Sequence, residues 1–302
     1  MDTSTVLNKV VVLFLIMVVG FVARKRNILT GDLNKKLSQL LLNVTLPFLI
    51  INSFNYEFSK DMLYNALIIF IFSVAIHGFS ILAGFLLFKK YPIEKKSVLQ
   101  FATVFSNCAF MGFPVLKSVF EDTGTFYGSI YNMVFNIFLW TYGVILFSRK
   151  KDTKILKKAA LNPGIISVVI GMLIFLFSIK LPGPILETLD MVGSMTVPIS
   201  MLIIGSLLAE TRFTTMFNDI SIYFCSLIRL VILPLLVYGV MKLIGISDML
   251  TNISVLLTAM PVAATTAIFA EMFDADSVFA SKCVAVSTLL SIVTIPLILM
   301  FL

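Results

Sequence analysis

Polar and flexible residues interrupt two long apolar runs of this chain. Each run contains a proline beside such residues: Asn107, Gly112 and Pro114 in one, and Met260, Pro261 and Thr265 in the other. Proline removes a backbone donor and frees a carbonyl upstream, and glycine loosens the backbone. At membrane depth, exposed backbone groups are tolerated only where they are buried in protein or line a cavity. Both runs are therefore predicted to be broken helices that line a binding cavity, and the alternative is that each proline only kinks its helix. Pro234 and Pro296 are expected only to kink their helices.

Four further polar residues lie deep in apolar runs. Asn132 and Asn136 are spaced i, i+4 and share one helix face, so two amides could donate to a carboxylate or simply hold helices together. Arg229 lies roughly 20 Å into its run, where a charge is costly. It would bind substrate or, as we favour, pair with carbonyls freed by a broken helix. His77 could titrate near neutral pH and couple the protein's function to protons, although a packed histidine is the more common role.

Catalytic constellations are missing from the sequence. With a single histidine, and neither an HExxH nor a GxSxG motif, the usual hydrolytic sites cannot be assembled. Cys108, Cys225 and Cys283 lie in apolar segments without a CxxC pair and are expected to pack in the core. We therefore predict that the chain is not an enzyme and has neither a cofactor nor a metal site. A channel is disfavoured because no charged ring or filter motif is recognisable.

The composition is that of a membrane protein. The chain has 302 residues, 59% of them hydrophobic and 13% charged, against roughly 25% charged in soluble domains. The net charge of +7 comes from residues in the short breaks between apolar runs, which is typical of loops that set topology. The lipid bilayer is therefore the expected partner, and no nucleic acid is expected.

Ten apolar runs are long enough to cross roughly 30 Å of hydrocarbon. The predicted spans are 5–23, 33–54, 62–88, 97–120, 125–148, 160–179, 184–209, 216–244, 249–271 and 277–301. Of the 23 basic residues, 17 fall in one set of alternate loops and 5 in the other, and Arg229 lies inside a span. Because cytoplasmic loops carry the excess of Lys and Arg, both termini are predicted to lie on the outer side of the cell membrane.

The sequence also contains a weak internal symmetry. Pro47 and Pro198 lie 151 residues apart, and Pro114 and Pro261 lie 147 apart, in corresponding spans of the two halves. An odd number of spans per half makes the halves run in opposite directions. We therefore predict an all-α membrane protein with ten transmembrane helices in two inverted five-helix repeats, whose fourth and ninth helices are broken and cross. The ranges are 1–148 for the first repeat, 149–159 for a short basic cytoplasmic loop and 160–302 for the second repeat.

Several of these segments together resemble the auxin efflux carrier family, which includes plant auxin carriers and bacterial malate or malonate permeases. The similar segments are Leu42 to Pro47 with Asn43 and Thr45, Ser106-Asn107 to Pro114, Tyr131 to Asn136 with Leu139-Trp140-Thr141, Asn162-Pro163, Val197-Pro198 with Ile204-Gly205, and Ala259 to Pro261. The resemblance implies a scaffold part and an elevator-like transport part. It also implies that helices four and nine cross at Pro114 and Pro261, and that Asn107 neighbours the anion site.

The sequence and the resemblance together predict a secondary transporter that moves a small organic anion by alternating access. The resemblance alone implies that this anion is a small carboxylate such as malate, malonate or an aromatic acid. The expected substrate-binding residues are Asn107, Gly112, Pro114, Asn132, Asn136, Met260, Pro261 and Thr265, supported by Asn43, Thr45, His77 and Arg229. The resemblance also suggests a homodimer formed through helices two and seven. Two alternatives stay open: a sodium- or proton-coupled symporter of the bile acid type, and a sensor or scaffold that keeps the carrier fold.

Overall fold

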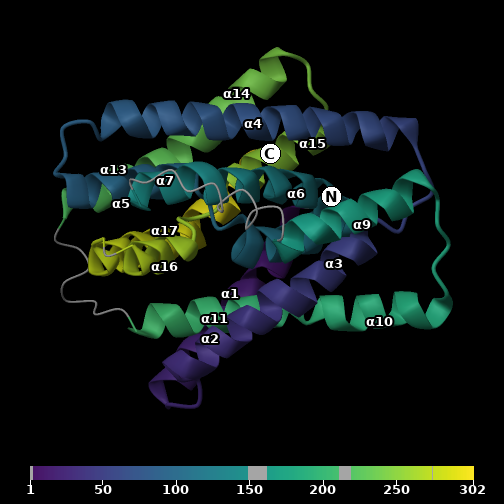
Figure 1. Ribbon diagram of the computed structural model, residues 1–302, viewed down its shortest axis with the longest axis horizontal. Helices are drawn as coiled ribbons and strands as arrows, with labels where there is room; N and C mark the ends of the chain where they lie inside the picture. Colours follow the sequence, from purple (N-terminus) through teal and green to yellow (C-terminus); the bar gives the residue numbers. More distant parts are fainter. Residues whose placement is uncertain (1–2, 149–161, 211–218, 274) are drawn as a thin grey trace. The chain divides into compact units, whose positions relative to one another are not determined.

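The structure, a computed structural model, describes residues 3–148, 162–210, 219–273 and 275–302 (Figure 1). The predicted basic loop 149–159 lies outside these ranges. Within them every regular element is helical, with α-helices and four short π-helical segments. The prediction of an all-helical protein is therefore confirmed.

Long apolar helices dominate the described part of the chain. Five helical stretches have the length and composition to cross a membrane: Lys60–Leu87, Cys108–Phe147, Gly183–Ala209, Ile220–Leu243 and Ser277–Phe301. The second comprises 40 residues, about 60 Å if it were straight, but it is interrupted at Glu121, whose backbone has φ 55° and ψ −138°. The apolar helices 163–176 and 248–259 are shorter.

The chain divides into two compact units, and each combines segments from both halves of the sequence. Unit 1 comprises residues 1–70, 109–136 and 160–210, and unit 2 comprises 71–108, 137–159 and 211–302. Two helices, α4 (Lys60–Leu87) and α6 (Phe113–Phe138), contribute to both units.

Unit 1 is built on close contacts between helix backbones. Its other helices are α1 (Thr3–Lys25), α2 (Gly31–Leu40), α3 (Leu46–Ser53), α9 (Pro163–Leu176), α10 (Gly183–Ser194) and α11 (Thr196–Glu210). Helices α1 and α11 pack along each other, and α3 contacts both α9 and α10 (Figure 1). A methyl group on Gly205 would lie 1.8 Å from the Met17 carbonyl oxygen, and one on Gly20 would lie 2.3 Å from the Leu202 carbonyl oxygen. Glycine is therefore required at both points where α1 meets α11.

Unit 2 contains the two helices whose ends form the candidate site, α5 (Ile93–Val104) and α15 (Asp248–Ala259). Its other α-helices are α7 (Val144–Ser148), α13 (Ile220–Leu227), α14 (Leu233–Leu243), α16 (Thr265–Met272) and α17 (Ser277–Phe301). Helix α17 contacts α5, α13, α15 and α16. At the start of α5, the Lys95 ammonium lies 2.5 Å from the carboxylate of Asp219, which caps α13. This hydrogen bond raises the pKa of Lys95.

The π-helical segments follow a proline pattern. Three of them, η1 (Leu41–Thr45), η2 (Cys108–Gly112) and η4 (Ile228–Ile232), each end two residues before a proline: Pro47, Pro114 and Pro234. Because a proline ring clashes with the carbonyl four residues earlier and cannot donate, the preceding turn widens. The fourth, η3 (Leu139–Gly143), has no proline two residues after its end.

Substituting Gly205 with alanine should destabilise the protein, because the added methyl would overlap the α1 backbone. Overpacking of this kind costs about 1–3 kcal/mol, so the detergent-purified variant should have a Tm several degrees below that of the wild type. Gly239→Ala is the matched control, since a methyl there meets no atom within 4 Å. An unchanged Tm for Gly205→Ala would contradict the close packing of α1 and α11.

Candidate functional site

Two helices of unit 2 break where the sequence predicted broken helices. Helix α5 ends at Val104, and Phe105 continues in an extended conformation with φ −101° and ψ 105°. Helix α15 ends at Ala259, and Met260 is extended with φ −61° and ψ 146°. Pro261 follows directly and cannot continue the helix. Both breaks leave carbonyl groups at a helix end without intrahelical donors.

The two breaks are joined by backbone hydrogen bonds. Ser106 and Val262 form an isolated antiparallel bridge. On either side of it, the Asn107 N–H donates to the Pro261 carbonyl at 2.7 Å and the Ala263 N–H donates to the Phe105 carbonyl at 3.0 Å. Segments 105–107 and 260–263 therefore form a crossing of two broken helices in unit 2.

Arg229 neutralises the carbonyl ends of both broken helices. Its side chain is fully buried and is carried by η4. One guanidinium nitrogen donates to the Thr103 carbonyl at 2.7 Å and to the Val104 carbonyl at 3.3 Å, at the end of α5. The other donates to the Thr258 carbonyl of α15. Since helix C-termini carry partial negative charge, one cation stabilises two helix ends at once. Pro234, expected only to kink its helix, follows the π segment that carries this arginine.

Several hydroxyls around the crossing find no hydrogen-bond partner in the described part of the chain. They are the buried side-chain oxygens of Ser106, Thr265 and Thr266. Ser106 lies in the bridge, and the two threonines begin α16. Leaving such a group unsatisfied costs about 1–3 kcal/mol, and native proteins rarely accept that cost without a role for the group. The first turn of α16 adds partial positive charge. This combination of donors suits an anion or another acceptor-rich ligand.

The predicted substrate-binding residues are divided between the two units. Asn107, Met260, Pro261 and Thr265 belong to unit 2, at or beside the crossing, where Asn107 and Met260 are buried. Unit 1 contains the others: Gly112, Pro114, Asn132 and Asn136. Pro114, expected at the crossing itself, is the second residue of α6, and the bridged backbone lies at 105–107.

Asn132 and Asn136 form a separate polar group in unit 1. The Asn136 amide donates to the Asn132 carbonyl of its own helix at 2.8 Å. A methyl group on Gly164, in the first turn of α9, would lie 3.6 Å from the Asn132 amide nitrogen and 3.8 Å from that of Asn136. The side chain of Asn162 caps this helix by accepting from the Gly164 N–H at 2.9 Å. Both asparagines therefore line the start of α9. This position is compatible with both roles predicted from the sequence, helix packing and ligand binding.

The expected supporting residues other than Arg229 make local contacts. Asn43 donates to the Gln39 carbonyl at 2.8 Å and Thr45 lies 3.5 Å from the Leu41 carbonyl oxygen, both within their own helix. His77 is buried in unit 2; its Nδ1 donates to the Ser73 carbonyl at 2.7 Å and its ring stacks on Phe138 at 5.3 Å. These contacts favour a packing role for His77.

Thr266 and Trp140 are two candidate residues that were not among the predicted substrate-binding residues, although Trp140 lies in a segment that resembles the family. Each has a buried polar atom without a partner among the described residues, the Thr266 hydroxyl and the Trp140 indole nitrogen. The threonine pair that begins a helix just after Pro261 was a usable signal, because a broken helix exposes the first turn of its second half. No motif pointed to the orientation of the tryptophan.

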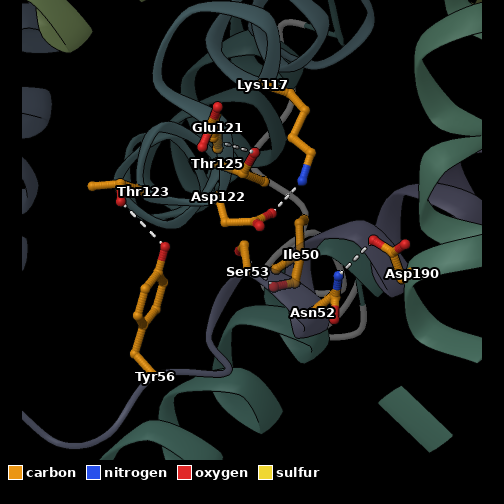
Figure 2. Close-up of polar contacts among 10 residues, drawn as sticks. All are labelled: Ile50, Asn52, Ser53, Tyr56, Lys117, Glu121, Asp122, Thr123, Thr125 and Asp190. Carbon is orange, nitrogen blue, oxygen red and sulfur yellow. Dashed lines mark hydrogen bonds and ion pairs between the residues drawn. The ribbon is translucent and has the colours of Figure 1, made fainter. Parts of the chain in front are cut away.

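A cavity of about 390 Å³ lies elsewhere, in unit 1, lined by Asn52, Asn55, Tyr56, Asp122, Leu186, Glu187 and Asp190. Figure 2 shows that four of its polar side chains pair with each other or with neighbouring residues. Asn52 donates to Asp190 at 3.2 Å, the Tyr56 hydroxyl lies 3.2 Å from that of Thr123, and Lys117 pairs with Asp122. Three lining carboxylates would repel an anion, so this cavity is not the candidate anion site.

Comparisons with known proteins identify similar chains of transporter type. The profile of a family described as membrane transport protein matches residues 5–156 and 149–299. An uncharacterized transporter of Methanocaldococcus jannaschii is 23% identical over 303 residues, which cover 96% of this chain and 97% of that protein. An uncharacterized transporter of Methanothermobacter thermautotrophicus is 25% identical over 301 residues, which cover 98% and 97%.

Replacing Arg229 with methionine should strongly destabilise the protein, because it leaves the carbonyl ends of α5 and α15 without their shared donor. Hydrogen bonds to a charged group contribute about 1.5–3 kcal/mol each, so we expect a loss of about 3 kcal/mol or more, seen as a Tm lower by several degrees.

Lys242→Met is the matched control, since it removes a cation from an exposed ion pair with Asp248 and should leave the Tm almost unchanged. A wild-type Tm for Arg229→Met would show that the guanidinium does not hold the crossing together.

Proposed function

We propose that this chain, which belongs to the membrane transport protein family that includes the auxin efflux carriers, moves a small organic anion across the cell membrane by alternating access. Membership makes the protein a membrane transporter, and the family is one of transporters rather than enzymes. The crossing in unit 2 is the observation that carries the choice of an anion. There, hydroxyls without a partner in the described ranges lie at the start of α16 and in the bridge, and Arg229 neutralises the carbonyl ends of α5 and α15.

The proposed architecture has ten membrane spans in two inverted repeats. Described helical residues fall within each of the ten predicted spans. The stretch Cys108–Phe147, at about 60 Å, is twice the hydrocarbon thickness, and its interruption at Glu121 suits a turn between two spans. The charge bias of the loops supports termini on the outside. A homodimer through the second and seventh spans remains a prediction.

An elevator-like mechanism fits the division into two units. Each unit is assembled from discontinuous segments of both sequence halves, as expected if one part carries substrate and the other is a scaffold. Unit 2 contains the crossing and would be the transport part. Its anion site would comprise Ser106, Asn107, Thr265 and Thr266. Arg229 would keep the crossing rigid while unit 2 moves.

The direct test is substrate-induced current on purified protein in proteoliposomes. Small mono- and dicarboxylates are screened with and without proton and sodium gradients, and radiolabel exchange detects electroneutral transport. Saturable current or exchange with a carboxylate would support the proposal, and the gradient dependence would choose among uniport, proton coupling and sodium coupling. Silence in both assays would overturn anion transport and favour a sensor that retains the carrier fold.

Thr266→Val should reduce carboxylate transport at least ten-fold, because it removes a fully buried hydroxyl that has no partner within the described residues. Its Tm should be unchanged or slightly higher, since an unsatisfied polar group is lost. Thr288→Val is the control: this buried hydroxyl donates to the Val284 carbonyl at 2.7 Å and should not affect transport. Equal rates for the two variants would remove Thr266 from the site.

Asn107→Ala and Pro114→Ala should each reduce the transport rate at least five-fold while expression and Tm stay near wild type. The first removes an amide beside the crossing, and the second changes the start of α6 after its π segment. Pro296→Ala is the control, because that proline lies inside the otherwise regular helix α17. Wild-type transport by both test variants would disprove the broken-helix mechanism.

A further inference from the structure

The ring nitrogen of Trp140, a side chain of intermediate exposure, is a buried donor that nothing in the proposed mechanism uses. This nitrogen is inaccessible and finds no acceptor in the part of the chain that the structure describes. An indole N–H can only donate, and a buried tryptophan normally finds an acceptor. Trp140 is the only tryptophan of the chain.

A π-helical segment positions this side chain. Trp140 is the second residue of η3, the π segment that no proline follows. Instead, its last residue, Gly143, lies tightly against α5: a methyl there would be 3.0 Å from the Phe101 ring and 3.3 Å from the Phe105 ring. Single π turns within helices occur frequently at functional sites, where they redirect side chains.

The indole packs against α16, the helix that begins with the two threonines whose hydroxyls have no partner among the described residues. The ring centroids of Trp140 and Phe269 are 5.6 Å apart. Phe269 lies four residues after Thr265 and three after Thr266, so its side chain neighbours each of them on the surface of α16. The tryptophan therefore contacts α16 about one turn, or roughly 5 Å along the helix axis, after the two threonines that begin this helix.

The ring that Trp140 contacts belongs to an aromatic cluster of described residues. Phe269 is buried, and its ring centroid lies 5.3 Å from that of Phe101 and 6.0 Å from that of Phe273. A carboxylate buried against such rings would lose its hydration without gaining a countercharge. A neutral oxygen would need only the one hydrogen bond that the indole can donate.

We propose that Trp140 is a specificity-determining residue of the anion site, and that its indole N–H donates to a neutral carbonyl oxygen carried by a monocarboxylate substrate. The inference rests on the proposed function, because the threonine end of α16 binds the carboxylate. The substrate class is a keto or amide monocarboxylate whose second oxygen lies roughly 5 Å from the carboxylate, the rise of one helical turn.

The test compares 4-oxopentanoate with pentanoate, which lacks only the keto oxygen, and with succinate, which has a second charge. Calorimetry on purified protein in lipid nanodiscs measures each affinity. The wild type should bind 4-oxopentanoate at least ten-fold more tightly than the other two. Trp140→Phe retains a ring but not the donor, so the preference over pentanoate should disappear while pentanoate affinity changes less than three-fold. Tyr142→Phe, in the same π segment, is the control and should keep the preference.

The wild-type emission spectrum gives a second readout that needs no variant. Because Trp140 is the single tryptophan, 4-oxopentanoate should shift its emission and pentanoate should not. The proposal is overturned if Trp140→Phe keeps the preference, if the wild type has none, or if bound 4-oxopentanoate leaves the emission unchanged. If no carboxylate binds to the wild type, the anion site itself fails, which is distinguishable from equal binding of all three ligands.

Discussion

The guanidinium of Arg229 is the interaction on which the crossing depends. Two helices of unit 2 end inside apolar segments of the chain. The last carbonyls of both helices carry partial negative charge. In hydrocarbon or dry protein such ends are unstable without donors. A single buried side chain donates to both of them. Once the helix ends are held, the short bridge at Ser106 and Val262 can fix their register.

Proline determines where the helices of this protein loosen, and it acts at a distance of a few residues. Pro234 widens the turn that carries Arg229, and Pro114 follows the π turn after the crossing. Pro261 stops α15 directly. Proline lacks a backbone donor, and its ring clashes with an upstream carbonyl. The same property thus ends one helix and produces a wider, π-helical turn in others. In η3, the close approach of Gly143 to two aromatic rings accompanies the π turn instead.

The parts of the fold that could be predicted depend on local chemistry. Helical class follows from apolar run length, since only helices satisfy the backbone of single long apolar segments in a membrane. Arg229, deep in such a run, had to find oxygen atoms, and Pro261 had to end a helix. Which carbonyls Arg229 would contact, which hydroxyls would stay unpaired and how Trp140 would turn depend on packing between separate segments, such as the contact of Arg229 with Thr103, 126 residues away. The grouping of helices into two units, each from both sequence halves, is likewise a property of tertiary contacts.

The electrostatics of the crossing are asymmetric, and this asymmetry decides what it can bind. A broken helix produces a negative end and a positive end. At this crossing the negative ends of α5 and α15 are neutralised by a residue of the protein, whereas the positive end that begins α16 carries two threonine hydroxyls without partners among the described residues. An inorganic cation would therefore compete with a fixed guanidinium for the same carbonyls. An anion meets donors that no described residue has taken, so the sign of the bound charge follows from which helix ends the protein itself has satisfied.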